Sequence, residues 1–324
     1  MTSGPMTEPS APSEFDVRVD PPDIADWLLG NTGIAGVWTF ESGRPGPHVA
    51  ISALMHGNEY CGAIVLDRLL RAGVRPAAGR LSLAFLNIEA FSRFDPAKPT
   101  VSRFIDEDMN RLWDPQMLDC RRRSLELDRA RDLRPWVDTV DVLLDIHSML
   151  WPSDAVVLCG GTDKGRDLGL SLPCIGVVVS DHGHENGRRL IDYPRFADPD
   201  SPSAGNLLEA GEHWMPETPE IAALAASGLL RRFGLADWGS AASSTTMPAR
   251  FARVTHAVTA ATPHFAFVQP YRGGEVVAER NTLIALDGET EVRTPYDQCL
   301  LVLPSLRPGR GHTAVRLARF ETVG

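Results

Sequence analysis

Lysine is almost missing from this 324-residue sequence, which contains only Lys98 and Lys164 beside thirty arginines. Neither lysine lies in a P-loop motif, so the chain offers almost no candidate for a P-loop lysine or for Schiff-base chemistry. Positive charge is scarce as a whole, because 42 acidic residues against 32 basic ones give a formal net charge of −10. This balance argues against nucleic acid or an anionic membrane surface as a partner, since both are bound by basic patches.

Cysteine pairs and long apolar segments are also lacking. The five cysteines include no Cys-x-x-Cys pair, which gives no support to a cysteine-based zinc site or a thioredoxin-like motif. Their scattered positions favour a reducing compartment, and we expect the protein in the cytoplasm. No run of 18 apolar residues occurs, so we expect no membrane span. Residues 1–14 are polar and proline-rich without an apolar core, which predicts a disordered leader and not a signal peptide.

Apolar strand-like segments alternate with helical ones over residues 15–240. Strands are predicted at 36–40, 48–55, 80–88, 140–146, 155–159 and 174–180, and helices at 21–30, 58–74, 121–136 and 218–235. This alternation predicts an α/β fold with a mixed, largely parallel sheet flanked by helices. Such sheets bind ligands at the carboxyl ends of their strands.

The chain changes character after residue 235. Residues 236–250 are small and polar and are predicted to form a linker. From about residue 250 onward, short apolar segments favour strands, with turn signals at Gly273-Gly274 and Asp287-Gly288. We therefore expect a disordered leader (1–14), a catalytic domain (15–240) and a small β-rich C-terminal domain (245–324).

His56 and Glu59 follow the apolar segment 48–55 directly, at the start of the next predicted helix. Their i, i+3 spacing on a helical turn points both side chains the same way, so that they can share a metal ion. The spacing alone is a weak signal, because a helix-start histidine and a surface glutamate explain it equally well. Its position at the end of a buried strand favours the metal site.

A third ligand is then expected at another strand end. His147 follows the strand at 140–146, and with His56 and Glu59 it gives a His₂Glu set. Three protein ligands with a fourth position open for water are typical of catalytic zinc. Asp145 shares the strand face of His147, either as a carboxylate that orients an imidazole or as a surface or capping group.

A rival histidine cluster surrounds His182 and His184. A His-x-His pair can bind a metal from a strand. Gly183 and Gly187 indicate a loop instead, for which a lid over the active site is the functional alternative.

Four separated segments occur in the order MHGNEYCG, SRFIDEDMNRLW, LLDIHS and LLEAGEHW. Together they resemble the succinylglutamate desuccinylase and aspartoacylase family, which consists of zinc deacylases with a carboxypeptidase-like catalytic domain. The resemblance covers roughly residues 35–235. It implies one Zn²⁺ per chain, held by the residues that match His56, Glu59 and His147.

The resemblance also implies roles around Asp108-Met-Asn110-Arg111. Asn110 and Arg111 are implied to bind the substrate carboxylate, and an arginine fork beside an amide donor suits that group. From the residues alone, a structural pair between Asp108 and Arg111 is the alternative. Arg103, five residues before Asp108, is implied to polarise the scissile carbonyl.

Glu209 is implied as the general base, and it directly follows an apolar pair, as a strand-end residue should. Glu212 in the same segment is the other candidate. The family uses a further arginine for substrate recognition upstream of the base. Arg188, Arg189 and Arg195 are candidates for that role, and the spacing does not distinguish them.

The reaction that these residues support is hydrolysis of the amide bond of a small N-acyl amino acid or a related compound. The expected partner is therefore a small molecule with a carboxylate, and a homo-oligomer is compatible with the sequence. A metallocarboxypeptidase is the first alternative, although the C-terminal domain of the resembled family narrows access to small substrates. A non-catalytic ligand-binding module is the second, although no residue of the four motifs is missing.

Overall fold

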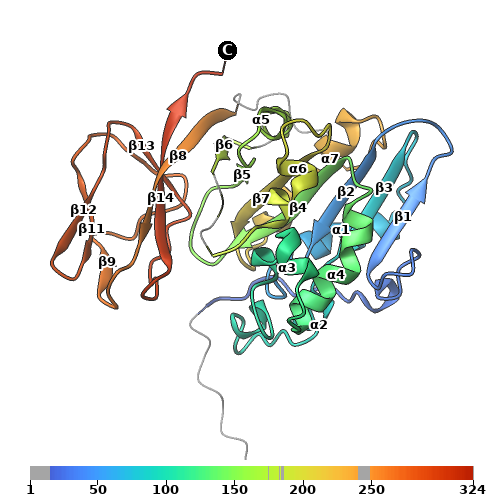
Figure 1. The fold of residues 1–324 in the computed structure, drawn as a ribbon, viewed down its shortest axis with the longest axis horizontal. Coiled ribbons are helices and arrows are strands. Elements are labelled where there is room, and N and C mark those ends of the chain that lie inside the picture. Colours follow the sequence, from blue (N-terminus) through green and yellow to red (C-terminus); the bar gives the residue numbers. More distant parts are fainter. Residues whose placement is uncertain (1–14, 174, 182, 184–185, 240–248, 324) are drawn as a thin grey trace, which may run out of the picture.

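The computed structural model describes residues 15–173, 175–181, 183, 186–239 and 249–323. The predicted leader and most of the predicted linker lie outside these residues. No helix in the described ranges is both long and apolar enough to cross a membrane. Figure 1 shows helices gathered around one end of a long sheet and a β-rich part at the other end.

The elements before residue 240 alternate much as the sequence predicts. The strands are β1 (Val37–Glu41), β2 (His48–Ala53), β3 (Arg80–Phe85), β4 (Val142–Met149), β5 (Val156–Leu158), β6 (Val177–Ser180) and β7 (Ala204–Glu212). The α-helices are α1 (Cys61–Arg71), α2 (Ile88–Phe91), α3 (Pro115–Asp119), α4 (Leu125–Val137), α5 (Asp163–Leu170), α6 (Pro194–Ala197) and α7 (Glu217–Arg232). Short 3-10 turns are η1 (Ala25–Trp27), η2 (Val101–Arg103), η3 (Met109–Arg111) and η4 (Leu190–Asp192).

The helix predicted at 21–30 is wrong in extent, because only η1 forms there. None of its three residues is buried. Only Trp27 of this turn packs against the core, so the turn lacks the continuous apolar face that stabilises most protein helices.

The remaining strands follow residue 249. They are β8 (Arg250–Thr259), β9 (Phe265–Phe267), β10 (Val276–Val277), β11 (Leu283–Asp287), β12 (Thr290–Arg293), β13 (Cys299–Val302) and β14 (Thr313–Glu321). Strand β8 pairs with β6 in parallel, so one eleven-stranded sheet joins the two parts in the order β1-β3-β2-β4-β7-β5-β6-β8-β14-β13-β10. Strands β12, β11 and β9 form a separate antiparallel sheet. The predicted fold class is thus confirmed.

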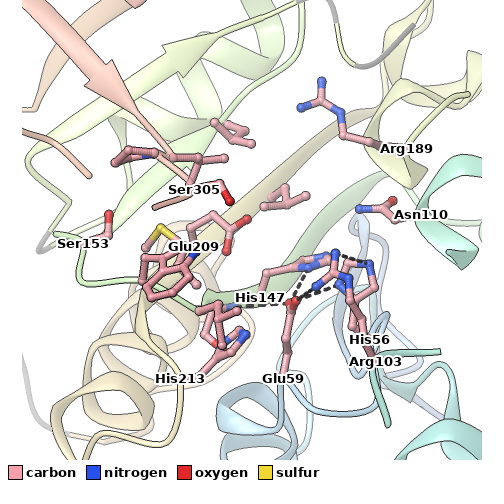
Figure 2. A pocket seen from close by; sticks show the side chains of 18 of the residues that line it. His56, Glu59, Arg103, Asn110, His147, Ser153, Arg189, Glu209, His213 and Ser305 are labelled. Carbon is pink, nitrogen blue, oxygen red and sulfur yellow. Dashed lines mark hydrogen bonds and ion pairs between the residues drawn. The ribbon is translucent and has the colours of Figure 1, made fainter. Parts of the chain in front are cut away.

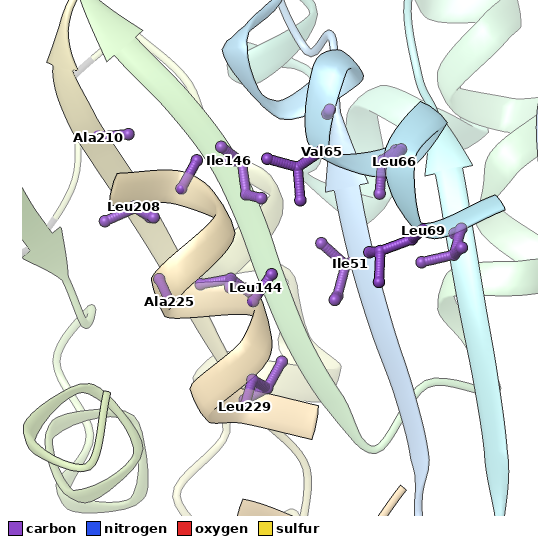
Figure 3. Packing of buried hydrophobic residues seen from close by; sticks show 14 of the residues in the cluster. Ile51, Val65, Leu66, Leu69, Leu144, Ile146, Leu208, Ala210, Ala225 and Leu229 are labelled. Atoms are coloured by element: carbon purple, nitrogen blue, oxygen red, sulfur yellow. The ribbon is translucent and has the colours of Figure 1, made fainter. Parts of the chain in front are cut away.

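Apolar helix faces cover both sides of the sheet where it is largely parallel. Helices α1 and α7 pack on one side, and Figure 3 shows Val65 and Leu229 against Ile51 and Leu144 of the strands. Helices α3 and α4 pack on the other side. All six residues of β2 and all eight of β4 are buried. Adjacent parallel strands β2, β4 and β7 therefore end at a common, well-packed edge, where the predicted metal ligands and Glu209 lie.

Candidate active site and metal centre

The loop after β2 is shaped by two backbone features. Leu54 adopts a left-handed conformation with φ of 62°, which turns the chain sharply as the strand ends. Gly57 then packs so closely that a Cβ would lie 2.4–2.5 Å from backbone atoms of Ala90, Phe91 and Ser102. Only glycine fits this contact without displacing its neighbours. The loop that carries His56 and Glu59 is therefore fixed against the segment that carries Arg103.

The three predicted metal ligands converge. His56, Glu59 and His147 are all buried, and one ligand atom from each lies within 4.8 Å of the others. His56 Nδ1 lies 2.9 Å from Glu59 Oε1, and His147 Nδ1 lies 2.8 Å from Glu59 Oε2. Figure 2 shows the three side chains meeting at the floor of a pocket.

Each imidazole has a carboxylate behind it. Asp108 Oδ1 lies 2.9 Å from His56 Nε2, and Asp145 Oδ2 lies 2.9 Å from His147 Nε2. Asp145 also accepts a hydrogen bond of 2.7 Å from Ser52 Oγ and is fully buried. Asp145 is therefore not a surface group, and it lies where a carboxylate can orient the imidazole of His147. With Nε2 of each histidine bound to an aspartate, Nδ1 of both histidines faces Glu59.

The charges in this cluster are strongly coupled. Burial alone would raise the pKa of Glu59, but His56, Arg103 and His147 hold it well below its usual range. Burial alone would lower the pKa of His147, yet Asp145 and Glu59 raise it well above the usual value. The Glu59 carboxylate thus lies between positive groups. A divalent cation can take over their role by binding the carboxylate and the imidazoles and displacing the protons of the histidines.

Glu209 lies beside this cluster on the neighbouring strand. It pairs with His147 in the register of β7 and β4, and its carboxylate points into the pocket (Figure 2). Its Oε2 atom is buried and has no hydrogen-bond partner among the described residues. Burial, together with the nearby carboxylates of Glu59 and Asp145, raises the pKa of Glu209 to about 8. Glu212, the rival base, lines a different cavity with Glu217.

Arg103 lies over the carboxylate of Glu59. Its Nη1 donates to Glu59 Oε1 at 2.5 Å, and its Nη2 lies 3.5 Å from Asp108 Oδ2. The pKa of Asp108 is well below its usual range, because His56, Arg103 and Arg111 outweigh the effect of burial.

Asn110 and Arg111 face the same pocket. Asn110 Oδ1 accepts a hydrogen bond of 2.9 Å from the backbone of Leu190, and Figure 2 shows the amide nitrogen directed toward the cavity. Arg111 Nη2 lies 3.6 Å from Asp108, which makes the structural ion pair a long one. Burial and the neighbouring guanidinium groups of Arg103, Arg189 and Arg316 lower the pKa of Arg111.

The buried Glu126 holds this segment in place. Its carboxylate accepts hydrogen bonds from three consecutive backbone amides, Ile105 (2.7 Å), Asp106 (3.0 Å) and Glu107 (3.2 Å). It also accepts a bond of 3.2 Å from Asn87 Nδ2. Sequence reasoning missed it, because a glutamate in the first turn of an arginine-rich helix suggests a solvated position.

Of the three candidate arginines upstream of Glu209, Arg189 is the one that lines the pocket. The Arg189 guanidinium is held by Asp181 and Asp192. Arg188 pairs with Asp114 in a half-exposed position, and Arg195 bonds to Asp141. The rival cluster of His182 and His184 lies outside the described residues.

Two more pocket residues were not singled out from the sequence. His213 lies in the LLEAGEHW motif, and its Nδ1 is 2.7 Å from Ser148 Oγ. Arg316 comes from β14 in the β-rich part, and no local motif marks it. The whole pocket has a volume of about 180 Å³ and is lined by His56, Glu59, Arg103, Asn110, Arg111, His147, Ser148, Met149, Leu150, Trp151, Pro152, Ser153, Leu158, Arg189, Leu207, Glu209, His213, Leu303, Pro304, Ser305 and Arg316.

Comparison with known proteins agrees with this architecture. Residues 45–156 match the model of the succinylglutamate desuccinylase/aspartoacylase catalytic domain, a family of deacylases. No curated protein is similar enough in sequence to count as a relative. The match spans the segments that carry the three predicted metal ligands, Arg103, Asn110 and Arg111, and it confirms the family resemblance.

Solved structures of similar fold cover most of the chain. Succinylglutamate desuccinylase from Vibrio cholerae has a TM-score of 0.67 and 16% identity, over 88% of this chain and 86% of that one. The succinylglutamate desuccinylase from Vibrio parahaemolyticus gives 0.65 and 16%, over 89% and 87%. The product-bound ectoine utilization protein EutE (DoeB) from Ruegeria pomeroyi gives 0.60 and 16%, over 87% and 88%. At these identities the likeness establishes the fold.

Proposed function

Because residues 45–156 match the model of the succinylglutamate desuccinylase/aspartoacylase catalytic domain, we propose that the protein is a zinc-dependent amidohydrolase that deacylates a small N-acyl amino acid or a related compound. One observation carries the proposal. His56, Glu59 and His147 converge within a single small pocket that also contains Glu209 and the Asn110–Arg111 pair. Metal ligands, a base and a carboxylate-binding pair are the parts that such a hydrolase needs.

The donor set fits one zinc ion per chain. Two imidazoles and a carboxylate are the ligands that catalytic zinc takes when a fourth position is kept for water. The Nδ1 atom of His56 is buried and makes no well-directed hydrogen bond, although Glu59 lies 2.9 Å away. Asp108 and Asp145 contact the opposite nitrogens, as the partners of zinc-bound histidines do.

In the proposed mechanism Glu209 moves the proton. Zinc, when bound, supplies Lewis acidity that makes water a better nucleophile and stabilises negative charge on a carbonyl oxygen. The Glu209 carboxylate accepts a proton from the attacking water and then donates it to the leaving nitrogen. Burial and the neighbouring carboxylates of Glu59 and Asp145 favour uptake of a proton by Glu209, which suits a group that first accepts a proton and then donates it.

The remaining residues orient the substrate. Asn110 and Arg111 hold its carboxylate through the amide nitrogen and the guanidinium group, which fixes the scissile amide over the metal ligands. Arg103, which contacts Glu59 at the pocket floor, donates hydrogen bonds to the oxygen on which charge develops. His213, held by Ser148, completes the wall beside the ligands.

The size of the pocket favours a small substrate over a peptide. Its volume of about 180 Å³ is below the range of roughly 300–1,000 Å³ that is typical of sites for drug-sized molecules. The β-rich part supplies some of the lining, namely Leu303, Pro304 and Ser305 after β13 and Arg316 on β14. It therefore restricts access of large substrates to the pocket. We keep the cytoplasm as the proposed location, in line with the free thiols of Cys61, Cys120, Cys159 and Cys299.

A panel of N-acyl amino acids tests the proposal. The zinc-loaded protein should release free amine from at least one member, and C-terminal peptide substrates should react far more slowly. Rapid release of C-terminal amino acids from peptides would support a carboxypeptidase instead. Zinc binding without turnover of either class would support a ligand-binding module.

A further inference from the structure

The pocket has two chemically different sides. Its cationic lining residues are Arg103, Arg111, Arg189 and Arg316, whereas its carboxylates are Glu59 and Glu209 at the metal ligands. Figure 2 shows Asn110 and Arg189 on one side and Ser153 and Ser305 on the other, with Glu209 between them.

The cationic side joins the two parts of the molecule. Arg316 of β14 is 5% exposed, and its Nε lies 3.5 Å from Asp181 Oδ2. The same Asp181 carboxylate is engaged by Arg189 at 2.6 and 3.1 Å. Arg111 lies close enough to Arg189 and Arg316 for both to lower its pKa. A carboxylate placed here would relieve repulsion between like charges that are largely buried.

The opposite side carries no aspartate, glutamate, lysine or arginine among its described lining residues, and its one imidazole, His213, has Nδ1 engaged by Ser148. Met149 ends β4, and Leu150, Trp151 and Pro152 continue from it. Leu303 and Pro304, which follow β13, face the same cavity with the hydroxyl groups of Ser153 and Ser305. Arg307 lies 5.9 Å from the ring centroid of Trp151 and does not line the pocket. This wall can pack an alkyl group, but its described residues offer no cation to pair with a second carboxylate.

We infer that the site is specific for N-acyl amino acids whose acyl group is uncharged, and that Arg316 acts with Arg111 to bind the carboxylate of the amino-acid half. The inference rests on the proposed function and narrows it. The acyl chain lies against the side formed by Met149–Ser153 and Leu303–Ser305. Succinyl compounds are then disfavoured, because their second carboxylate loses water without gaining a cation.

Two substrates of equal acyl length test the acyl specificity without any variant. N-butanoyl and N-succinyl derivatives of one amino acid differ only in a terminal methyl or carboxylate group, and N-acetyl is measured beside them. The butanoyl compound should exceed the succinyl compound in kcat/KM by about 100-fold, as expected for burial of an unpaired charge. Equal or faster turnover of the succinyl compound would overturn the inference and leave the deacylase proposal intact.

Two further results of that experiment are decisive. If acetyl is fast and butanoyl is no better than succinyl, size and not charge selects the acyl group, and the inference fails. If no N-acyl amino acid is turned over, the proposed function itself fails, and the inference fails with it.

Substitution of Arg316 tests the carboxylate side. Arg316→Gln should raise KM for the preferred substrate about 10- to 100-fold, the usual effect of losing a charged hydrogen bond, and Arg316→Lys should restore part of the loss. KM for the same substrate with its carboxylate amidated should not change. Arg319→Gln is the matched control, because Arg319 lies on the same strand with its side chain exposed over Tyr296. Equal losses on both substrates, or no loss on either, would overturn the role of Arg316.

Discussion

Replacing Glu209 by glutamine removes the proposed base with little change in shape. The side chain keeps its length, and within the described part of the chain the buried Oε2 atom has no hydrogen-bond partner to lose. Folding and metal binding should therefore survive, while the ability to accept a proton does not.

The expected loss falls on kcat. General acid–base catalysis contributes about 10²–10⁴-fold, which corresponds to roughly 3–5 kcal/mol of activation free energy. KM should change little, because substrate binding is assigned to Asn110 and Arg111. Rates of amine release at saturating substrate measure kcat, and elemental analysis of the same preparation measures zinc.

Glu212→Gln is the control. Glu212 lies three residues further along, is half-buried and lines a separate cavity, so its variant should keep kcat within about twofold. A Glu209→Gln enzyme with near-normal turnover beside an inactive Glu212→Gln enzyme would refute the assignment. Loss of zinc from Glu209→Gln would show that this carboxylate is a ligand.

Four further predictions concern the supports of the site and the stability of the fold. His147→Ala should lose most of the bound zinc, because two of three protein ligands cannot hold it, and retention of a full equivalent by elemental analysis would contradict the site. Gly57→Ala should lower metal affinity and kcat together, since a Cβ 2.4–2.5 Å from three backbone atoms must displace the ligand loop; unchanged metal affinity in a zinc titration would count against it. Glu126→Gln should destabilise the fold by about 1–3 kcal/mol and lower kcat/KM with zinc still bound, because its amide cannot replace every bond to the 105–107 backbone; denaturant unfolding and kinetics together check this. Burial and Arg80 lower the pKa of His48 to about 4, so the unfolded chain gains a proton there as the pH falls from about 6.5 to 4 while the folded chain does not. The free energy of unfolding should then drop by up to about 3 kcal/mol across this window, and a His48→Gln variant with the same pH slope would contradict it.

The sequence predicted the parts of the site that belong to local patterns. The apolar segments before His56 and His147 predict buried parallel strands, and strand ends in such sheets meet at one edge. The ligand set His56, Glu59 and His147 follows from that rule, and the structure brings these residues together. Asp145 stayed ambiguous, because only its burial against His147 separates an orienting carboxylate from a surface one.

The residues that sequence reasoning missed depend on long-range contacts. Glu126 is buried because the loop at 105–107 folds over it, and nothing in its own helix signals this. Arg316 reaches the pocket because β8 pairs with β6 and carries β14 along with it, a connection between segments about 70 residues apart. No local sequence pattern predicts either contact, whereas an apolar strand before a histidine predicts the strand-end ligands.

The central claim is that hydrolysis depends on one metal ion held by His56, Glu59 and His147. Titration of zinc into the metal-free protein, with release of amine from an N-acyl amino acid as the readout, tests it most directly. The account predicts no activity without metal and a linear rise that stops at one equivalent per chain, with no such rise for His147→Ala. Full activity of the metal-free protein, or a zinc-dependent rise that survives in His147→Ala, would contradict it.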